Sequence, residues 1–391
     1  MHRIKTCRVN PTGKISIYNF NYGIIKTVKF SESELSEFSI TLRKRVYGHF
    51  QSTNQSKYAN REMVIKTFVM LTMFILPFIL VITGVASTTW QLFACFIVAG
   101  LGMAGVGMGV MHDAIHGTYS KNPTINRILG YTLNMIGANA TVWKIQHNVL
   151  HHSYTNIDEH DDDINAPFFL RFSPNAEKNS LHKYQHLYAW IFYGLSTVSW
   201  VTAKDFIRLK RYHNKGLVKG ENGYRNALIE LIAWKIGYYI MTIVLPVIFS
   251  PFSIWMILLA HLVMHFITGL TITSVFQAAH IVPEVDFPLP DENGVIEGER
   301  MLHQMITTCN FAPGSNVFSW FIGGLNHQIE HHLFPDICHV HYRNIAPIVK
   351  ATAEEFNVPY FEKPTFFLAV KDHLKMLYLL GNEKLEPVKV I

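Results

Sequence analysis

Residues 90–116 read WQLFACFIVAGLGMAGVGMGVMHDAIH. No charged side chain occurs from Trp90 to Met111. A helix rises by about 1.5 Å per residue, so this segment can cross a hydrocarbon core of ~30 Å. His112 and His116 follow it at a spacing of i, i+4, which places both rings on one helical face. The stretch therefore predicts a membrane helix that ends in a pair of imidazoles.

Three further apolar segments are long enough to cross a membrane. Thr67–Ala86 lies just before the first segment, so the two form a tight hairpin. Leu231–Phe249 and Phe252–Phe276 form a second hairpin, in which Lys235 is the one charged residue. We therefore predict four transmembrane helices in two hairpins.

Two shorter apolar stretches, Ile128–Trp143 and Leu187–Ala203, have fewer than eighteen residues. This length is typical of re-entrant or interfacial segments rather than of spans. We expect neither stretch to cross, because a crossing by Leu187–Ala203 would move the C-terminal histidines to the opposite side of the membrane.

The composition agrees with a membrane protein. Hydrophobic residues make up 49% and charged residues 16%, whereas soluble domains carry about 25% charged residues. An ordinary soluble enzyme and a disordered chain are both excluded. Apart from Lys235, the basic residues lie in residues 1–66, 112–228 and 277–391, and neither hairpin turn contains one. The positive-inside rule then predicts that both termini and the central region are cytoplasmic. It also accounts for the formal charge of +6 without nucleic acid.

Eight of the 21 histidines fall into three clusters with metal-ligand spacing. The clusters are His112 and His116; His147, His151 and His152; and His327, His331 and His332. On an α-helix the first two histidines of each triplet share a face, and the third lies about 100° round the helix, where it can reach a second metal. His280, at the end of the last span, is a ninth candidate ligand.

This ligand set is too large for one zinc ion, which takes three or four protein ligands. The Glu-x-x-His motif of soluble di-iron carboxylate proteins does not occur. We predict a His-rich two-metal site, with iron the metal that fits best. Hydrogen-bond partners for the ligand histidines are expected among Asp113, Asn156, Gln328, Glu330 and the acidic run 158–163.

Three histidine boxes in this order resemble those of the membrane fatty acid desaturase family. The boxes are His112–His116, His147–His152 and Gln328–His332, and the similarity covers roughly residues 63–360. Surrounding residues also match: Trp143, Ser153–Asn156, Gly323–Asn326, Leu333–Pro335 and His339–Tyr342. The third box is similar to that of front-end and linoleoyl-CoA type desaturases.

The resemblance implies two iron ions, O2 as co-substrate, and removal of two hydrogens from a fatty acyl-CoA or acyl-lipid chain. It also implies electrons from ferredoxin or cytochrome b5 with its reductase. Many front-end relatives carry a fused cytochrome b5 domain with the motif His-Pro-Gly-Gly. That motif is absent, so we expect a separate electron carrier. No catalytic side chain is predicted beyond the metal centre, because the cofactor carries the chemistry.

The sequence departs from the family pattern at two points. Three residues, rather than the common two, precede the histidine pair of the second box. In the third box both His327 and Gln328 are available as the first member, at i+4 and i+3 from His331. We favour His327 as the ligand.

These features predict an all-α integral membrane protein with a cytosolic helical cap that holds the di-metal site. The expected segments are a lead-in 1–66, hairpin 67–111, a cytosolic or interfacial region 112–228, hairpin 229–276 and a C-terminal region 277–391. A bacterial inner membrane fits better than the endoplasmic reticulum. The alternatives are a di-iron hydroxylase or ketolase of the same superfamily and, more distantly, a metal transporter.

A basic cluster follows the second short apolar stretch: Lys204, Arg208, Lys210 and Arg211. We interpret it as a positive-inside anchor. Contact with phosphates of CoA or lipid is the alternative.

Overall fold

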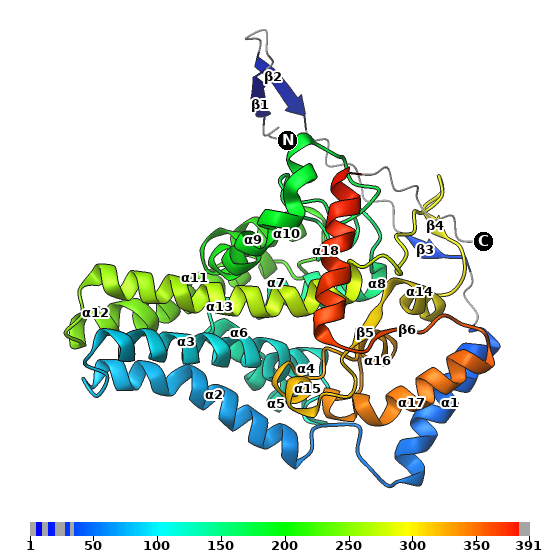
Figure 1. The fold of residues 1–391 in the computed structure, drawn as a ribbon, viewed down its shortest axis with the longest axis horizontal. Coiled ribbons are helices and arrows are strands. Elements are labelled where there is room, and N and C mark those ends of the chain that lie inside the picture. The colour runs from blue at the N-terminus through cyan, green and yellow to red at the C-terminus, as the bar shows by residue number, and fades with distance from the viewer. Residues whose placement is uncertain (1–4, 10–14, 20–27, 32–34, 383–391) are drawn as a thin grey trace.

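The computed structural model describes residues 5–9, 15–19, 28–31 and 35–382, and helices make up most of it (Figure 1). Four helical segments are long and apolar enough to cross a membrane: Arg61–Ile82, Thr89–His116, Gly223–Phe249 and Ile254–His280. They lie side by side along the long axis of the molecule in Figure 1. The prediction of four spans is therefore confirmed, although α2 (Arg61–Ile82) and the third segment begin before the predicted spans. Helical hydrogen bonding continues there into polar residues, which hydropathy alone does not detect.

Two of these segments contain π-helical turns. The second consists of α3 (Thr89–Gly105), η1 (Val106–Val110) and α4 (Met111–His116). The third consists of α11 (Gly223–Tyr239), η5 (Ile240–Val244) and α12 (Leu245–Phe249). The fourth is the uninterrupted α13 (Ile254–His280). Short π-turns inside α-helices occur frequently at functional sites.

Neither short apolar stretch is among the candidate spans found in the described residues. Ile128–Trp143 is divided among α5 (Pro123–Gly130), α6 (Thr132–Met135) and α7 (Ala140–Lys144). Leu187–Ala203 belongs to a longer helical run: α9 (Gln185–Ser199), the π-turn η4 (Trp200–Lys204) and α10 (Asp205–Asn214).

The run α9–η4–α10 packs tightly against α13. A Cβ atom on Gly269 would lie 2.6 Å from the carbonyl oxygens of both Tyr193 and Gly194, so the two backbones can meet only at a glycine. Thr197, three residues before the π-turn η4, donates a hydrogen bond to the carbonyl of His265 (2.9 Å). This contact helps to hold the run α9–η4–α10 against α13.

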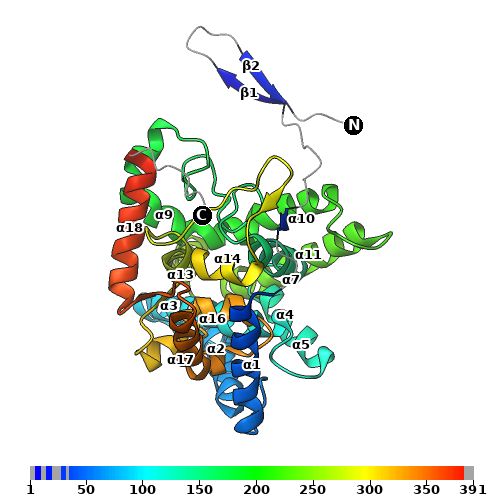
Figure 2. The same ribbon diagram turned by 90° about the vertical axis from the view of Figure 1, so that its right-hand side faces the viewer.

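The remaining elements gather at the histidine-bearing end of the bundle, which Figure 2 views face on. The helices are α1 (Glu37–Ser52), η2 (Ile145–His151), α8 (His152–Tyr154), η3 (Ser180–Tyr184), α14 (Arg300–Thr307), α15 (Asn316–Phe321), α16 (Gln328–Leu333), η6 (His339–His341), α17 (Tyr342–Glu355) and α18 (Phe366–Asn382). Strands β1 (Lys5–Val9) and β2 (Ile15–Asn19) pair antiparallel; β3 (Lys29–Phe30) with β4 (Val295–Ile296), and β5 (Cys309–Phe311) with β6 (Phe361–Lys363), pair parallel.

The short helix α16 is held in place by a core of its own. Ile329 packs in one apolar cluster with Leu42 and Val46 of α1 and Ile345 and Val349 of α17, and all five side chains are fully buried. Burial of an aliphatic side chain contributes about 1.5–3 kcal/mol. Apolar packing against α1 and α17 therefore holds the helix that carries the third histidine box in place.

Candidate metal centre

The first histidine box lies on α4, directly after the π-turn η1. The rings of His112 and His116 occupy consecutive turns, with centroids 4.7 Å apart. The loop before the third box reaches this region through Gly323, whose φ is +66°. A Cβ atom there would meet the carbonyl oxygen of Met108 at 2.3 Å, so a glycine is required for the approach.

The second box lies on a π-helix, η2, and not on an α-helix as expected. In a π-helix the hydrogen bonds run from i to i+5, so residues five apart share a face. His147 and His152 accordingly approach within 3.3 Å through their Nε2 atoms. The expected α-helical placement of His152, about 100° round from the face of His147 and His151, therefore does not hold for this box. The wider turn lets all three rings face the same interior.

The third box lies on α16, and His331 and His332 are both fully buried. His280, the last residue of α13, completes the arrangement. Its ring centroid lies 4.8 Å from that of His151 and 4.9 Å from that of His332.

Eight histidines make up two adjoining groups. Within each group the ligand atoms lie within 4.8 Å of one another. One group contains His112, His116, His147 and His331, and the other contains His151, His280 and His332. His152 joins them, since it also groups with His331 and His332. Sequence segments more than 200 residues apart therefore converge on one centre.

The nitrogen spacing in the interior suits metal ligation. The Nε2 atoms of His152 and His331 are 2.9 Å apart, and those of His151 and His332 are 3.2 Å apart. Two nitrogens bound to one ion at about 2.1 Å and at angles between a right angle and a tetrahedral one are roughly 3.0–3.4 Å apart. The histidines present thus fit a metal centre.

The acidic run is part of this centre rather than an exposed loop. Asp161 accepts from Nδ1 of His151 at 3.0 Å, and Asp163 accepts from Nδ1 of His147 at 3.2 Å. Gln146 also donates to Asp163. When Nδ1 carries the proton, the lone pair of Nε2 points inward, which is the form that binds metal.

Other outward nitrogens have neutral partners. Nδ1 of His331 lies 3.1 Å from the hydroxyl of Tyr342, and Nδ1 of His332 lies 2.7 Å from Oε1 of Gln304. Sequence reasoning missed Gln304, because a lone glutamine carries no signal of such a role. Tyr342 was noticed only as part of the similarity to the family.

Burial keeps most of these rings neutral. It holds the pKa of His152, His331 and His332 well below the ordinary value, and neighbouring histidines act in the same direction. Burial also lowers the pKa of His147 to about 3. His151 is the exception: burial disfavours its charged form, but the carboxylate of Asp161 raises its pKa. Neutral imidazole is the ligand form, so the centre is prepared for a cation.

The four other predicted partner residues have different surroundings. Asp113 accepts from Nδ1 of His339 (2.8 Å), and its Oδ1 lies 3.5 Å from Nδ1 of His112. The side-chain amide of Asn156 donates to the carbonyl of His280 (3.0 Å). Asp113 and Asn156 thus contact ligand histidines directly or through the backbone.

Glu330 and Gln328 contact none of the eight grouped histidines through a hydrogen bond among the described residues. Glu330 accepts from Asn310 and Tyr360 at 2.8 and 2.9 Å, and burial raises its pKa to about 7. Both amide atoms of Gln328 are buried without a partner in the part of the chain that the structure describes.

His327 belongs to neither group of histidines. It is the N-cap of α16, with φ −103° and ψ 59°, so it does not share the helical face of His331. Its Nδ1 lies 3.8 Å from Glu330, and neither ring nitrogen has a hydrogen-bond partner within the described ranges. The i, i+4 argument that favoured His327 over Gln328 therefore does not hold, because the helix begins one residue too late.

A cavity of about 550 Å³ adjoins the histidines. Its wall includes His112, His147, Trp143 and Phe276, together with the inner face of α9–η4–α10. Apolar and aromatic side chains dominate it, with a few polar groups, which is the usual character of a ligand site. The cavity borders the metal-binding histidines at His112 and His147.

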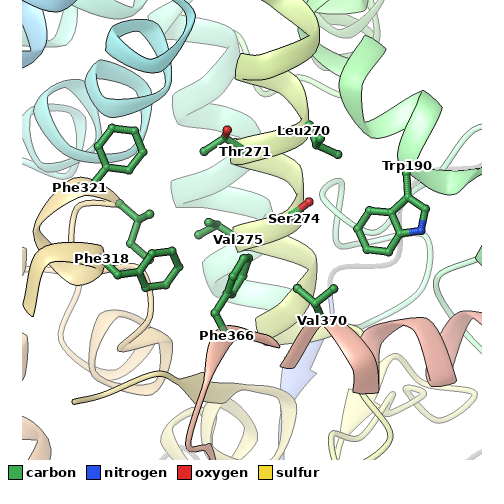
Figure 3. A pocket seen from close by; sticks show the side chains of 10 residues that line it. Trp190, Leu270, Thr271, Ser274, Val275, Phe318, Phe321, Phe366 and Val370 are labelled. Atoms are coloured by element: carbon green, nitrogen blue, oxygen red, sulfur yellow. The ribbon is translucent and has the colours of Figure 1, made fainter. Parts of the chain in front are cut away.

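A second cavity, of about 340 Å³, lies on the opposite face of α13 (Figure 3). In Figure 3 Trp190 points into it from one side and Phe318 from the other, with Phe366 between them. Leu270, Thr271, Ser274 and Val275 are its α13 residues, whereas Ile272, Thr273, Phe276 and Gln277 face the first cavity. At 100° per residue these sets lie on opposite sides of the helix. No histidine lines this second cavity.

Comparisons with known proteins agree with this geometry. The family model "Fatty acid desaturase" matches residues 87–364. The chain is 32% identical over 358 residues to the sn-1 linoleoyl-lipid 6-desaturase of Synechocystis sp., covering 91% of this chain and 98% of that protein. It is 34% identical to the sn-1 linoleoyl-lipid 6-desaturase of Arthrospira platensis (85% and 89% covered). It is 33% identical to the acyl-lipid (8-3)-desaturase of Physcomitrium patens (91% and 74% covered).

Proposed function

Because the chain belongs to the fatty acid desaturase family and is a fatty acyl desaturase, we propose that its substrate is a polyunsaturated precursor chain esterified in a membrane lipid. The new double bond forms between the carboxyl end and an existing double bond. The names of the relatives, which describe linoleoyl-lipid and acyl-lipid substrates, support this substrate class. The hydroxylase and transporter alternatives are not favoured.

We propose that the metal is iron and that two ions bind to the eight grouped histidines: His112, His116, His147, His151, His152, His280, His331 and His332. Two observations carry this proposal: the ligand atoms within each group lie within 4.8 Å of one another, and the Nε2 atoms of His147, His151, His152, His331 and His332 approach in pairs at 2.9–3.4 Å. The bound iron pair supplies the activation of dioxygen for C–H cleavage. In the overall reaction two hydrogens leave neighbouring methylenes, and with two external electrons and two protons they reduce one O2 to two water molecules.

The protein's own residues orient the ligands and the substrate. Asp161 and Asp163 keep protons on the outer nitrogens of His151 and His147, which leaves the inner nitrogens free to bind metal. The apolar wall of the larger cavity holds a methylene chain against His112 and His147 and excludes water from it. Exclusion of water also protects the activated oxygen from side reactions.

The membrane arrangement follows from the basic residues. We propose that both termini, residues 112–228 and residues 277–391 lie in the cytoplasm, with the segments 67–111 and 229–276 in the bilayer. This arrangement places all three histidine boxes on one side, where a separate carrier, ferredoxin or cytochrome b5 with its reductase, delivers electrons. A bacterial inner membrane fits this proposal.

Lipid analysis in a host without polyunsaturated lipids tests the function. We expect cells that express the chain and receive linoleate to accumulate an acyl chain with one more double bond, on the carboxyl side of the existing ones. Mass spectrometry with double-bond localisation identifies the product and separates it from a hydroxylated one. An unchanged lipid profile, with a ferredoxin or cytochrome b5 system co-expressed, would contradict the proposal.

A further inference from the structure

One long helical face forms a wall of the main cavity. The run α9–η4–α10 contributes Phe192, Tyr193, Leu195, Ser196, Ser199, Trp200, Lys204, Ile207, Arg208 and Arg211. Six of them recur at intervals of three or four residues, as on one helical face: Phe192, Ser196, Trp200, Lys204, Arg208 and Arg211. The stripe begins with aromatic residues and ends with cations, and Phe192 and Lys204 are about 18 Å apart along the axis. The wall therefore runs from an apolar end to a polar one.

Two of the three cations on this wall already have anionic partners. Arg211 pairs with the carboxylate of Asp162, and Arg208 donates to the carbonyl of Asp162 (3.0 Å) and lies 3.9 Å from its Oδ2. Tyr212 donates to the same carboxylate at 2.5 Å. Arg208 and Arg211 are thus already paired with Asp162, although the Nε of Arg211 has no hydrogen-bond partner among the described residues.

Lys204 has no such partner. Its ammonium lies over the ring of Trp200, 5.1 Å from the centroid, and the described residues offer it no hydrogen bond or ion pair. The nearest carboxylates are engaged elsewhere, Asp163 with His147 and Asp205 with Lys235. Burial, aided by the charge of Arg208, lowers the pKa of Lys204 to about 7. An acceptor oxygen on a ligand would remove the free-energy cost of leaving this buried donor without a hydrogen bond.

We propose that Lys204 donates a hydrogen bond to the carbonyl oxygen of the ester or thioester that carries the acyl chain, and thereby sets which methylenes lie at the histidines. The inference rests on the proposed function. An acyl substrate has one polar group at the head of a long apolar tail, which matches Lys204, the cation of this wall that no described carboxylate or carbonyl engages. His147 and Lys204 line the same cavity. A carbonyl held at Lys204 therefore fixes how many carbons of the acyl chain separate it from the methylenes at the histidines.

Paired substrates test this role directly. Purified enzyme, reconstituted with a reductant, is assayed with linoleoyl-phosphatidylglycerol and with its ether-linked analogue, which lacks the carbonyl oxygen. We expect the wild type to prefer the ester about 10- to 100-fold in kcat/KM, mainly through KM, as for a hydrogen bond from a charged donor. Lys204→Met should lose this preference and spread the double bond over neighbouring positions. Lys204→Arg should retain part of the preference for the ester and part of the selectivity for one double-bond position.

Lys210→Met is the matched control, because Lys210 is exposed on the same helix and does not line the cavity. It should behave as the wild type does. Parallel assays with linoleoyl-CoA show whether the carbonyl comes from a lipid ester or a thioester. An equal ester preference and unchanged double-bond position in Lys204→Met would overturn the proposal. If Lys204→Met does not fold, a wild type that accepts ester and ether analogues equally, with the same product positions, overturns it as well. A wild type that forms no double bond at all would instead contradict the proposed function.

Discussion

Replacement of His331 by alanine is expected to remove detectable desaturation and to lower the metal content by about one ion per chain. His331 lies in both the first group and the group shared with His152, and its Nε2 is within 2.9 Å of His152 and 3.4 Å of His147. Loss of an outer hydrogen-bond partner alone typically costs about 10–100-fold in affinity or activity, so loss of the ligand itself should cost more. Elemental analysis and product formation of the purified His331→Ala variant measure both effects.

His213→Ala is the matched control. His213 is exposed on α10, stacks on Tyr224 and belongs to no metal-sized group among the described residues. It should keep both metal and activity. If His331→Ala retained full metal content and wild-type turnover, the eight-histidine centre would be wrong.

The second large effect is expected for Asp161→Asn. Asp161 accepts from Nδ1 of His151 and also from the backbone N–H groups of Asn156 and Asp163, each at 2.9 or 3.0 Å. An asparagine amide would place a donor against these donors. We expect a loss of about 10–100-fold in turnover or metal affinity, measured by steady-state kinetics and by metal retention during dialysis against a chelator.

Glu159→Gln provides the comparison, because Glu159 belongs to the same acidic run but is exposed. That variant should match the wild type. Equal kinetics and equal metal retention in Asp161→Asn and Glu159→Gln would show that the carboxylate does not orient His151.

Much of this architecture could be predicted from the sequence, because its signals are local. Uncharged segments such as Trp90–Met111 predict membrane helices by their length alone, and clustered histidines indicate metal binding. Leu187–Ala203, which the sidedness argument predicted not to be a span, is not among the four helical segments that are long and apolar enough to cross a membrane in the described part of the chain.

Other features depend on contacts that sequence spacing does not encode. The π-helix that carries His147 and His151 and ends directly before His152 replaces the expected α-helical geometry, and nothing in its composition distinguishes it. The start of α16 at Gln328 separates His327 from the face of His331. Gln304 approaches His332 across 28 residues of chain, and such an isolated polar residue is visible only once the fold brings it to the centre.

The basic cluster shows the same limit. Lys204, Arg208 and Arg211 look alike as an anchor in the sequence. In the structure both arginines pair with Asp162, whereas Lys204 lines the cavity without a hydrogen-bond or ion-pair partner among the described residues. Their separate roles follow from which carboxylates lie nearby, and that depends on the tertiary fold.

Metal analysis of the purified wild-type protein in mild detergent tests the central claim most directly. Eight histidines arranged as two adjoining groups should retain about two iron ions per chain, since imidazole ligands suit iron and one zinc ion takes only three or four protein ligands. Iron at this stoichiometry, with Mössbauer spectra of a coupled pair, is the result that we predict. About one zinc per chain with no iron, in a preparation that still forms double bonds, would contradict the account.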